Sequence, residues 1–442
     1  MANDRVGAKI VHELFGTTFQ EQGRGFYISL ELLAICRGII DAGGSLLSNT
    51  SEPIEYERRS HDLARRLAMG TSISREELVE AVEGETTETT LRALFSSLVI
   101  TVPGRRVKRP PWFAAHFYPF VGELVHYDAV DRRGGFSIER YMFRNAGGFA
   151  YHVLRTDPDL GRRDRVARML ESLVMDSDTA LGRIAGAIHS HDRVKSSQLF
   201  TDESESDAVV NGDVSPWPSL LRSGCDQIGN RVSVPRAKRV EQLLHWVPYC
   251  VVRHQLHLAR VKIGKSRESI TVDALSRANP IRKNSQERLT GYRWDIVKAL
   301  AKTAVELKAS DGLEVAAKYT QPNPAFAASP RAFFSETLAA VGALNATSGK
   351  RHFTFKAPML EALLAATIPD GVDIEFEEYC RILFEELALV IGPSEARSAE
   401  LTGGIDEADF RANRSEFRQR LESAGLLTHY SDATDLVHGE IR

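Results

Sequence analysis

Residues 240–261 read VEQLLHWVPYCVVRHQLHLARV, and this stretch decides the fold class. It is typical of an α-helix, although Pro248 lacks the backbone N–H of a helical hydrogen bond, so we expect a boundary or kink there. Further helical patterns recur on both sides, over 30–40, 56–69, 74–84, 87–98, 164–188, 285–309, 331–344, 357–367, 376–391 and 407–423. The sequence therefore predicts a mainly α protein with a few short strands.

The chain of 442 residues is long for one hydrophobic core, and we expect a multi-domain helical protein. The predicted segments are a helical domain over 1–109, a mixed aromatic-rich and helical region over 110–200, an acidic loop or linker over 201–230, a basic helical region over 231–330 and an acidic C-terminal helical domain over 331–442. The linker prediction depends on acidic and proline residues, namely Asp202, Glu203, Glu205, Asp207, Asp213, Pro216 and Pro218.

The N-terminal region has the element order of a winged helix-turn-helix. Three short helical patterns, one of them opened by the capping-box residues Ser74 and Glu77, precede a β-like run over 98–102. A Pro103-Gly104 turn then leads into four cations, Arg105, Arg106, Lys108 and Arg109. The alternative is an ordinary helical domain, because three short helices and a turn occur in most helical proteins.

The composition excludes several classes of protein. Hydrophobic residues make up 43% and charged residues 26%, as in globular chains and unlike disordered ones. The start, MANDRVGAKIVHELFG, has no long apolar segment of a secretory signal, and no run approaches the roughly 20 apolar residues of a membrane-spanning helix. The unpaired spacing of the four cysteines, Cys36, Cys225, Cys250 and Cys380, favours a reducing compartment. We therefore expect a bacterial cytoplasmic protein with no membrane partner.

The charges are divided unevenly along the chain, although their total is only −3. Residues 231–293 hold 14 Lys or Arg against four acids, and residues 370–442 hold 17 acids against seven arginines. A basic stretch of this density neutralises phosphates and releases counterions, so we predict nucleic-acid binding, with DNA preferred over RNA. The predicted contacts are nine cations, Arg253, Arg260, Lys262, Lys265, Arg267, Arg277, Arg282, Lys283 and Arg288.

Neighbouring amides at Asn279, Asn284 and Gln286 could add hydrogen bonds to phosphates or base edges. Two other interpretations of the basic stretch stay open. It could be a solvated helical surface, or it could dock on the acidic tail of the same chain or on an acidic protein partner.

No complete catalytic motif is present in the sequence. Cys250, His254 and His257 could share one helix face as zinc ligands, but without a CxxC pair we favour core packing and surface histidines. The HSHD sequence at 189–192 departs from the spacing of metallohydrolase motifs, and the GKS sequence at 264–266 lacks the upstream glycine of a phosphate-binding loop. We therefore predict no metal and no cofactor, and an unrecognised metal-dependent enzyme is an alternative.

Two stretches resemble a known group of proteins. Residues 279–285 read NPIRKNS, and the C-terminal region has Gly425-Leu426-Leu427 followed by Ser431-Asp432-Ala433. Together they resemble accessory, non-ATPase proteins of bacterial anti-phage defence islands, such as methylation-associated or phosphorothioation-linked systems. The resemblance covers about the last 170 residues and includes no catalytic signature. It implies a DNA-associated component that works beside separate ATPases, nucleases or methyltransferases, and it transfers no active-site residues.

These observations predict a non-enzymatic accessory protein that binds nucleic acid and other protein subunits, within an anti-phage defence complex. The alternative is a scaffold subunit whose basic stretch binds an acidic protein partner. We also expect the acidic C-terminal helices either to contact a partner or to restrain the basic surface, because the two regions carry opposite net charges of equal size.

Overall fold

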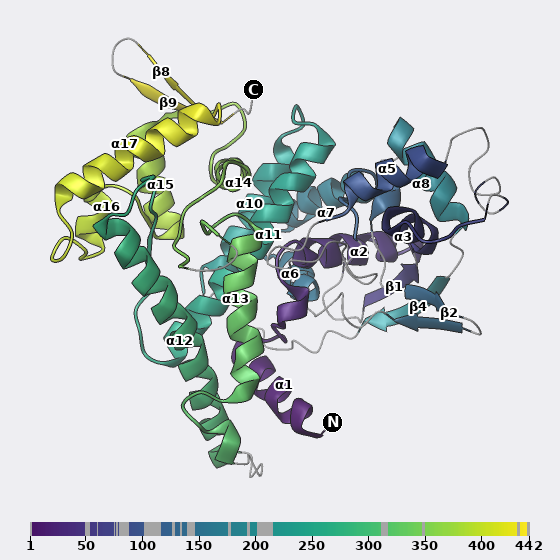
Figure 1. Ribbon diagram of the computed structural model, residues 1–442, viewed down its shortest axis with the longest axis horizontal. Helices are drawn as coiled ribbons and strands as arrows, with labels where there is room; N and C mark the ends of the chain where they lie inside the picture. The colour runs from purple at the N-terminus through teal and green to yellow at the C-terminus, as the bar shows by residue number, and fades with distance from the viewer. Residues whose placement is uncertain are drawn as a thin grey trace.

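The structure is a computed structural model that describes residues 2–48, 54–59, 61–74, 76, 78, 88–100, 116–125, 129–132, 135–138, 146–175, 178–191, 195–200, 215–310, 317–346, 350–430 and 434–439. In these ranges the chain forms fifteen α-helices and nine short strands, which confirms the mainly helical fold class (Figure 1). No helix among the described residues is both long enough and apolar enough to cross a bilayer.

The central element is α11, an unbroken helix over Arg236–Lys262. Of the boundary or kink predicted at Pro248, the boundary is wrong, because the proline is buried inside this helix, and the kink stays a prediction. The helices packed against α11 are α2 (Tyr27–Asp41), α10 (Trp217–Asn230), α12 (Pro280–Ser310), α13 (Ala328–Ala340) and α14 (Ala357–Thr367). At Gly224 a Cβ atom would stand 2.2 Å from the Trp246 indole nitrogen, so this glycine permits the close approach of α10 and α11.

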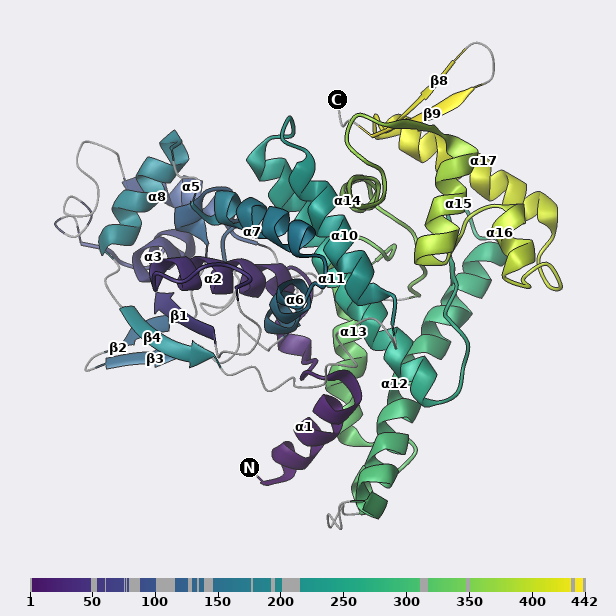
Figure 2. The same cartoon turned by 180° about the vertical axis from the view of Figure 1, so that it is seen from behind.

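The N-terminal half forms a helical body on one side of α11 (Figures 1 and 2). Its helices are α2, α3 (Asp62–Met69), α5 (Glu88–Leu98), α6 (Ala146–Arg155), α7 (Leu160–Met175) and α8 (Ala180–His191). Helix α1 (Ala2–Phe15) lies apart from them, against α12. Strand β1 (Ile54–Arg59) pairs antiparallel with β4 (Lys195–Phe200), and β2 (Ala129–Arg132) pairs antiparallel with β3 (Gly135–Ile138).

Two N-terminal predictions change. Residues 56–59 belong to β1 rather than to the start of a helix, because they pair with β4, and the helix begins at Asp62. Helix α5 agrees with its predicted range, and Val99 then bridges to Phe117. The Pro103-Gly104 turn, its four cations and Glu77 of the capping box lie outside the described residues. The winged helix-turn-helix therefore stays a prediction.

The predicted linker over 201–230 is wrong in its second part. Residues 217–230 form α10, and its apolar side chains Trp217, Leu221, Cys225 and Ile228 are buried in the main core. Spacings of four, four and three residues place these side chains on one face of the helix, and the two prolines stand at its start, where a helix tolerates them. Residues 201–214, which carry the acidic cluster, lie outside the described part of the chain.

The C-terminal half adds α12, α13, α14, α15 (Phe376–Leu387), α16 (Pro393–Ser398) and α17 (Glu407–Ser423). The ranges predicted for α14 and α17 are confirmed. Gly425 adopts a φ of +72° just after α17, and Leu426 N–H donates to Leu421 O across it, which is the glycine-dependent end expected there. Strand β5 (Ile270–Thr271) runs parallel to β7 (Leu389–Val390), and β6 (Asp373–Glu375), β9 (Asp435–His438) and β8 (Leu427–His429) form a sheet in that order.

One hydrophobic core runs through most of the molecule. It contains buried residues from all five predicted segments, for example Ile35, Phe149, Trp217, Val247 and Phe417. The predicted boundaries at 230 and 330 therefore do not separate cores. The acidic C-terminal region is part of the same core, so it is not a detachable tail.

We expect Asn413→Ala to lower the free energy of unfolding by about 3 kcal/mol, because three buried backbone groups would lose their partner. Asn413 is fully buried on α17, where its side chain accepts from Ala274 N at 2.8 Å and donates to Val272 O at 2.9 Å and Ile391 O at 2.8 Å. Urea denaturation measures the change. Gln419→Ala, at an exposed position of α17, should change the free energy of unfolding by less than about 0.5 kcal/mol. Equal effects of the two substitutions would contradict this role of Asn413.

Candidate nucleic-acid interface

Arg253 is a core residue. Its side chain is 0% exposed, its guanidinium carbon lies 4.3 Å from the centroid of the Trp217 ring, and it donates to Tyr249 Oη at 2.7 Å. It also donates to Leu387 O at 3.0 Å and pairs with Glu268 Oε1 at 3.2 Å, where the carboxylate is fully buried as well. The structure therefore removes Arg253 from the predicted nucleic-acid contacts.

Three predicted cations near the end of α11 are paired with acids of α12. Arg260 Nη1 and Lys265 Nζ share the carboxylate of Asp295, at 2.7 and 2.5 Å, and Lys262 pairs with Glu306. Both acids lie beyond residue 293, outside the basic stretch in sequence. The net charge counted over 231–293 therefore overstates the positive charge that the folded protein offers to a ligand.

Three more predicted cations are bonded to the protein itself. Arg267 donates to backbone carbonyls at the end of α15, one of them at 3.0 Å. Arg282 Nε donates to the buried Asp273 carboxylate at 2.6 Å, and Arg288 Nη1 donates to Ser269 O at 3.1 Å. A ligand would have to compete with these bonds. Of the nine predicted contacts, Lys265, Arg267, Arg277 and Lys283 are exposed, and the described part of the chain gives Arg277 and Lys283 no ion pair.

The NPIRKNS stretch at the start of α12 has a structural explanation. Asn279 Oδ1 accepts from Arg282 N at 2.8 Å and so caps the helix, while Pro280 is its first residue. Asn279 Nδ2 donates to Asp273 Oδ1 at 3.0 Å, and Ser285 Oγ accepts from Phe353 N at 2.8 Å. The residues of this stretch thus fix α12 in place.

A polar groove opens between α12 and α13. Its volume is about 670 Å³, and it lies beside the short segment that follows residue 349. The residues that line it, here named the α12–α13 groove, are Gln286, Glu287, Leu289, Thr290 and Arg293 of α12, Ser335 and Glu336 of α13, and Lys350 and Arg351. Sequence reasoning selected only Gln286 among them.

Positive charge in the α12–α13 groove is incompletely neutralised. Arg351 pairs with Glu336 at 2.7 Å, but Arg293 has no ion pair within the described residues, and its Nε atom is buried without a hydrogen-bond partner. Burial, and then the positive charges of Arg331 and Arg351, lower the pKa of the Arg293 guanidinium. Because like charges face one another here without enough carboxylates, an anion in the groove would be stabilised.

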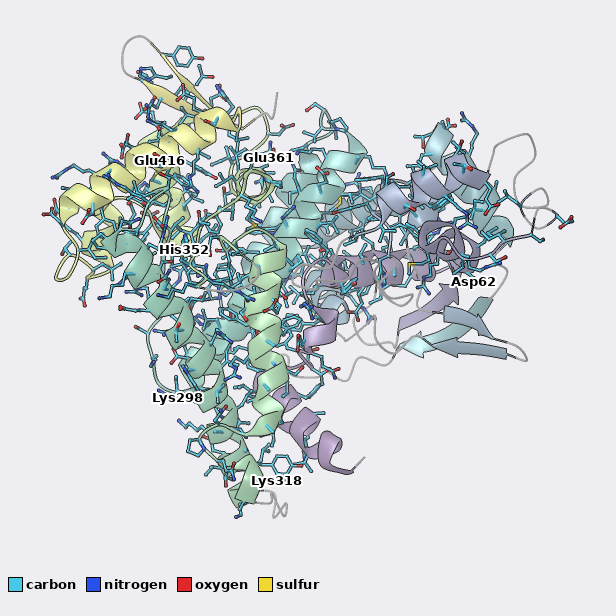
Figure 3. All side chains as sticks on the ribbon, viewed as in Figure 1. Asp62, Lys298, Lys318, His352, Glu361 and Glu416 are labelled. Carbon is cyan, nitrogen blue, oxygen red and sulfur yellow. The ribbon has the colours of Figure 1, made fainter. Side chains whose placement is uncertain are left out.

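Further cations and an aromatic side chain continue this face of α12. Lys283, Thr290 and Trp294 recur at helical spacing along one exposed side, and Lys298 follows one turn later (Figure 3). Trp294 is 40% exposed, and the guanidinium carbon of Arg331 lies 5.5 Å from its ring centroid. A helical projection of the predicted helix 285–309 could have found this exposed indole.

Cys250, His254 and His257, the candidate zinc ligands that we attribute to packing, are not brought together as a metal site in the described structure. Among the described residues, no group of three His, Cys, Asp or Glu side chains is arranged to hold a metal ion. Cys250 is buried, which raises the pKa of its thiol well above the usual range, whereas a zinc ligand must be a thiolate. Burial lowers the pKa of His254 to about 3, and its ring stacks on Phe149 with centroids 5.2 Å apart. Of the HSHD sequence, residues 189–191 end α8 and Asp192 lies outside the described residues.

His254 also faces a serine, but the arrangement lacks the rest of a catalytic triad. His254 Nδ1 lies 2.9 Å from Ser215 Oγ, and both side chains are buried. The other ring nitrogen, Nε2, has no hydrogen-bond partner among the described residues, so no acid orients the imidazole as a general base requires. The pair is best explained by packing.

The acidic C-terminal region uses much of its charge internally. Arg414 pairs with Glu377 at 2.7 Å, and Arg418 pairs with Asp435 at 3.1 Å. Among the described residues, Asp370 of this region pairs with the buried Arg231 of the basic stretch at 3.5 Å, and Glu361 pairs with Lys238. Figure 3 shows Glu416 on α17 well apart from Lys298 on α12. Restraint of the basic surface by the acidic helices therefore stays a hypothesis. Removal of residues 370–442 would also remove buried residues of the main hydrophobic core.

Comparison of the chain with protein-family models, with curated protein sequences and with solved structures gave no match. The resemblance to defence-island proteins therefore stays an expectation from the sequence.

We expect Glu268→Gln to lower the free energy of unfolding by about 3 kcal/mol at neutral pH, because Arg253 would lose its buried counter-charge. Burial alone would raise the pKa of Glu268, but the approach of His257 and Arg253 lowers it from 4.5 to about 2. A carboxylate with a lowered pKa stabilises the fold above the unfolded value and loses this effect as pH falls. The difference between wild type and variant should therefore shrink from pH 4.5 towards 2.

Urea denaturation at a series of pH values measures this difference. Glu306→Gln is the matched control, since Glu306 forms a partly exposed pair with Lys262 and its loss should cost less than about 1 kcal/mol. A difference that is independent of pH between 4.5 and 2 would show that the Glu268 carboxylate is not held charged by Arg253.

Proposed function

We propose that the protein is a non-enzymatic accessory protein that binds nucleic acid through the α12–α13 groove and the adjoining face of α12. The observation that carries this proposal is the set of cations there that lack carboxylate partners within the described residues. These cations are Arg277, Lys283, Arg293, Lys298, Arg331 and Lys350. Two carboxylates, Glu287 and Glu336, line the groove with them, and Glu336 is already paired with Arg351.

The physical support for phosphate as the ligand is the geometry of these cations. Lys283, Arg293 and Lys298 lie on α12, Arg331 lies on α13, and Arg277 and Lys350 lie outside these helices. A polyanion that spans them can meet several cations at once and release a counterion at each. Gln286, Thr290 and Ser335 also line this groove. The Gln286 amide can donate to phosphate oxygens, whereas the Thr290 and Ser335 hydroxyls donate to backbone carbonyls of their own helices. Arginine and a nearby lysine together combine directional and point-charge contacts to phosphate.

The finer parts of the proposal come from the sequence. They are DNA rather than RNA as the ligand, other protein subunits as further partners, a bacterial cytoplasmic location, and membership of an anti-phage defence assembly. The last is supported by the resemblance of residues 279–285 and of the region around Gly425. The alternative is a scaffold subunit whose groove receives an acidic segment of another protein.

We expect Arg293→Ala/Lys350→Ala to weaken binding of a labelled oligonucleotide and to reduce the slope of log K against log salt by roughly 1.5. Each lost phosphate contact removes roughly 0.7 to 0.9 from this slope. Fluorescence anisotropy of the full chain, titrated between about 50 and 200 mM salt, measures both quantities.

The matched control removes two exposed arginines elsewhere, by Arg168→Ala/Arg411→Ala on α7 and α17, and should leave the slope unchanged. Equal slopes for wild type and the groove variant would contradict the proposal. Failure of wild type to bind any nucleic acid, together with salt-sensitive binding of an acidic peptide, would favour the scaffold instead.

A further inference from the structure

Trp294 is the one tryptophan that the described residues leave open to solvent. The other two described tryptophans, Trp217 and Trp246, are 1% and 0% exposed and belong to the core, whereas Trp294 is 40% exposed on α12. Cations flank it along α12: Arg293 directly precedes it, and Lys298 follows one turn later. Arg331 of α13 also lies over the indole ring. An aromatic side chain among cations combines the two contacts that a nucleotide offers, a planar base and a phosphate.

The shape of the site favours an unpaired strand over a duplex. The major groove of duplex DNA has room for one α-helix. The charged face of α12 is bordered by α13 and by the segment at Lys350 and Arg351, so these neighbours would obstruct the entry of α12 into a major groove. The volume of about 670 Å³ is in the range of pockets that enclose small ligands, so a single nucleotide unit fits where a double helix does not. In a duplex the base faces are covered by their neighbours, and only an unpaired base can stack on an indole.

We propose that the α12–α13 groove and the exposed face of α12 beside it bind single-stranded nucleic acid. One base stacks on Trp294, which stands outside the groove lining, and adjoining phosphates are held by Arg293 and Lys350 in the groove. This inference rests on the nucleic-acid function proposed above and specifies its ligand class. Stacking on one aromatic side chain is tolerant of sequence because every base has a planar face. The site therefore binds with little sequence preference, and its affinity depends on both salt and the indole.

The test uses the full chain and labelled oligonucleotides of about 16 nucleotides, as oligothymidylate, oligouridylate and a mixed-sequence duplex. Wild type should bind the single strands about tenfold or more tightly than the duplex. Trp294→Ala should weaken single-strand binding by about tenfold and leave any duplex binding unchanged, while Trp294→Phe should recover much of the loss because it keeps an aromatic face. Comparison of the two single strands shows whether DNA or RNA is preferred.

Val305→Ala is the matched control. Val305 is an exposed apolar residue of the same helix, three turns beyond Trp294, and its truncation should change neither affinity nor stability. Tryptophan fluorescence gives an independent readout. A base stacked on Trp294 should quench the fluorescence of the wild-type protein, and Trp294→Phe should lose this quenching. Thermal unfolding of each variant separates a lost contact from a lost fold.

The outcomes separate this inference from the function on which it rests. If Trp294→Ala binds single strands as wild type does while Arg293→Ala/Lys350→Ala does not, stacking is overturned and nucleic-acid binding stands. Equal affinity of wild type for duplex and single strands overturns the preference for unpaired bases. If wild type binds no nucleic acid and instead binds an acidic peptide, both proposals fail.

Discussion

The buried ion pair between Arg253 and Glu268 is the interaction on which the arrangement of the C-terminal half depends. Both side chains are fully buried, so each charge would be strongly destabilising without the other. Arg253 also donates to Leu387 O at the end of α15 and lies over the Trp217 ring of α10. The Arg253 guanidinium thus joins α10, α11, the turn after α11 and α15. Strands β5 and β7, which pair with each other, begin two residues after Glu268 and Leu387.

The position of the groove follows from a second buried carboxylate, that of Asp273. The carboxylate accepts hydrogen bonds from Asn279 and Arg282 at the start of α12. The backbone N–H of Asp273 donates to Phe353 O at 2.9 Å. The Nε2 atom of His352 lies 3.2 Å from the same carboxylate. Because residues 352 and 353 follow directly on Lys350 and Arg351, this cluster holds the segment of Lys350 and Arg351 beside the start of α12.

The sequence was a good guide wherever local chemistry decides structure. Gly425 ends α17 because a left-handed residue closes the helix, and the ranges of α14 and α17 follow from apolar spacing alone. It was a poor guide where distant contacts decide. Pro248 stays helical because neighbouring helices cover α11, and residues 56–59 form a strand because residues 195–200 pair with them. The local sequence pattern around Pro248 and residues 56–59 does not reveal the helices that cover α11 or the strand that pairs with β1.

The candidate site shows the same limit in its charges. A count over 231–293 includes Arg260, Lys262 and Lys265, but their partners Asp295 and Glu306 lie outside that window. A cation that is buried or paired stabilises the fold and is unavailable to a ligand without a loss of that stability. Arg293 was not among the predicted contacts, yet its Nε is one of the buried nitrogens that have no hydrogen-bond partner among the described residues. Three of the six cations in the proposed interface, Lys298, Arg331 and Lys350, also lie outside that window. The density of positive charge along the sequence therefore selects a different set of residues from the absence of a carboxylate partner in the fold.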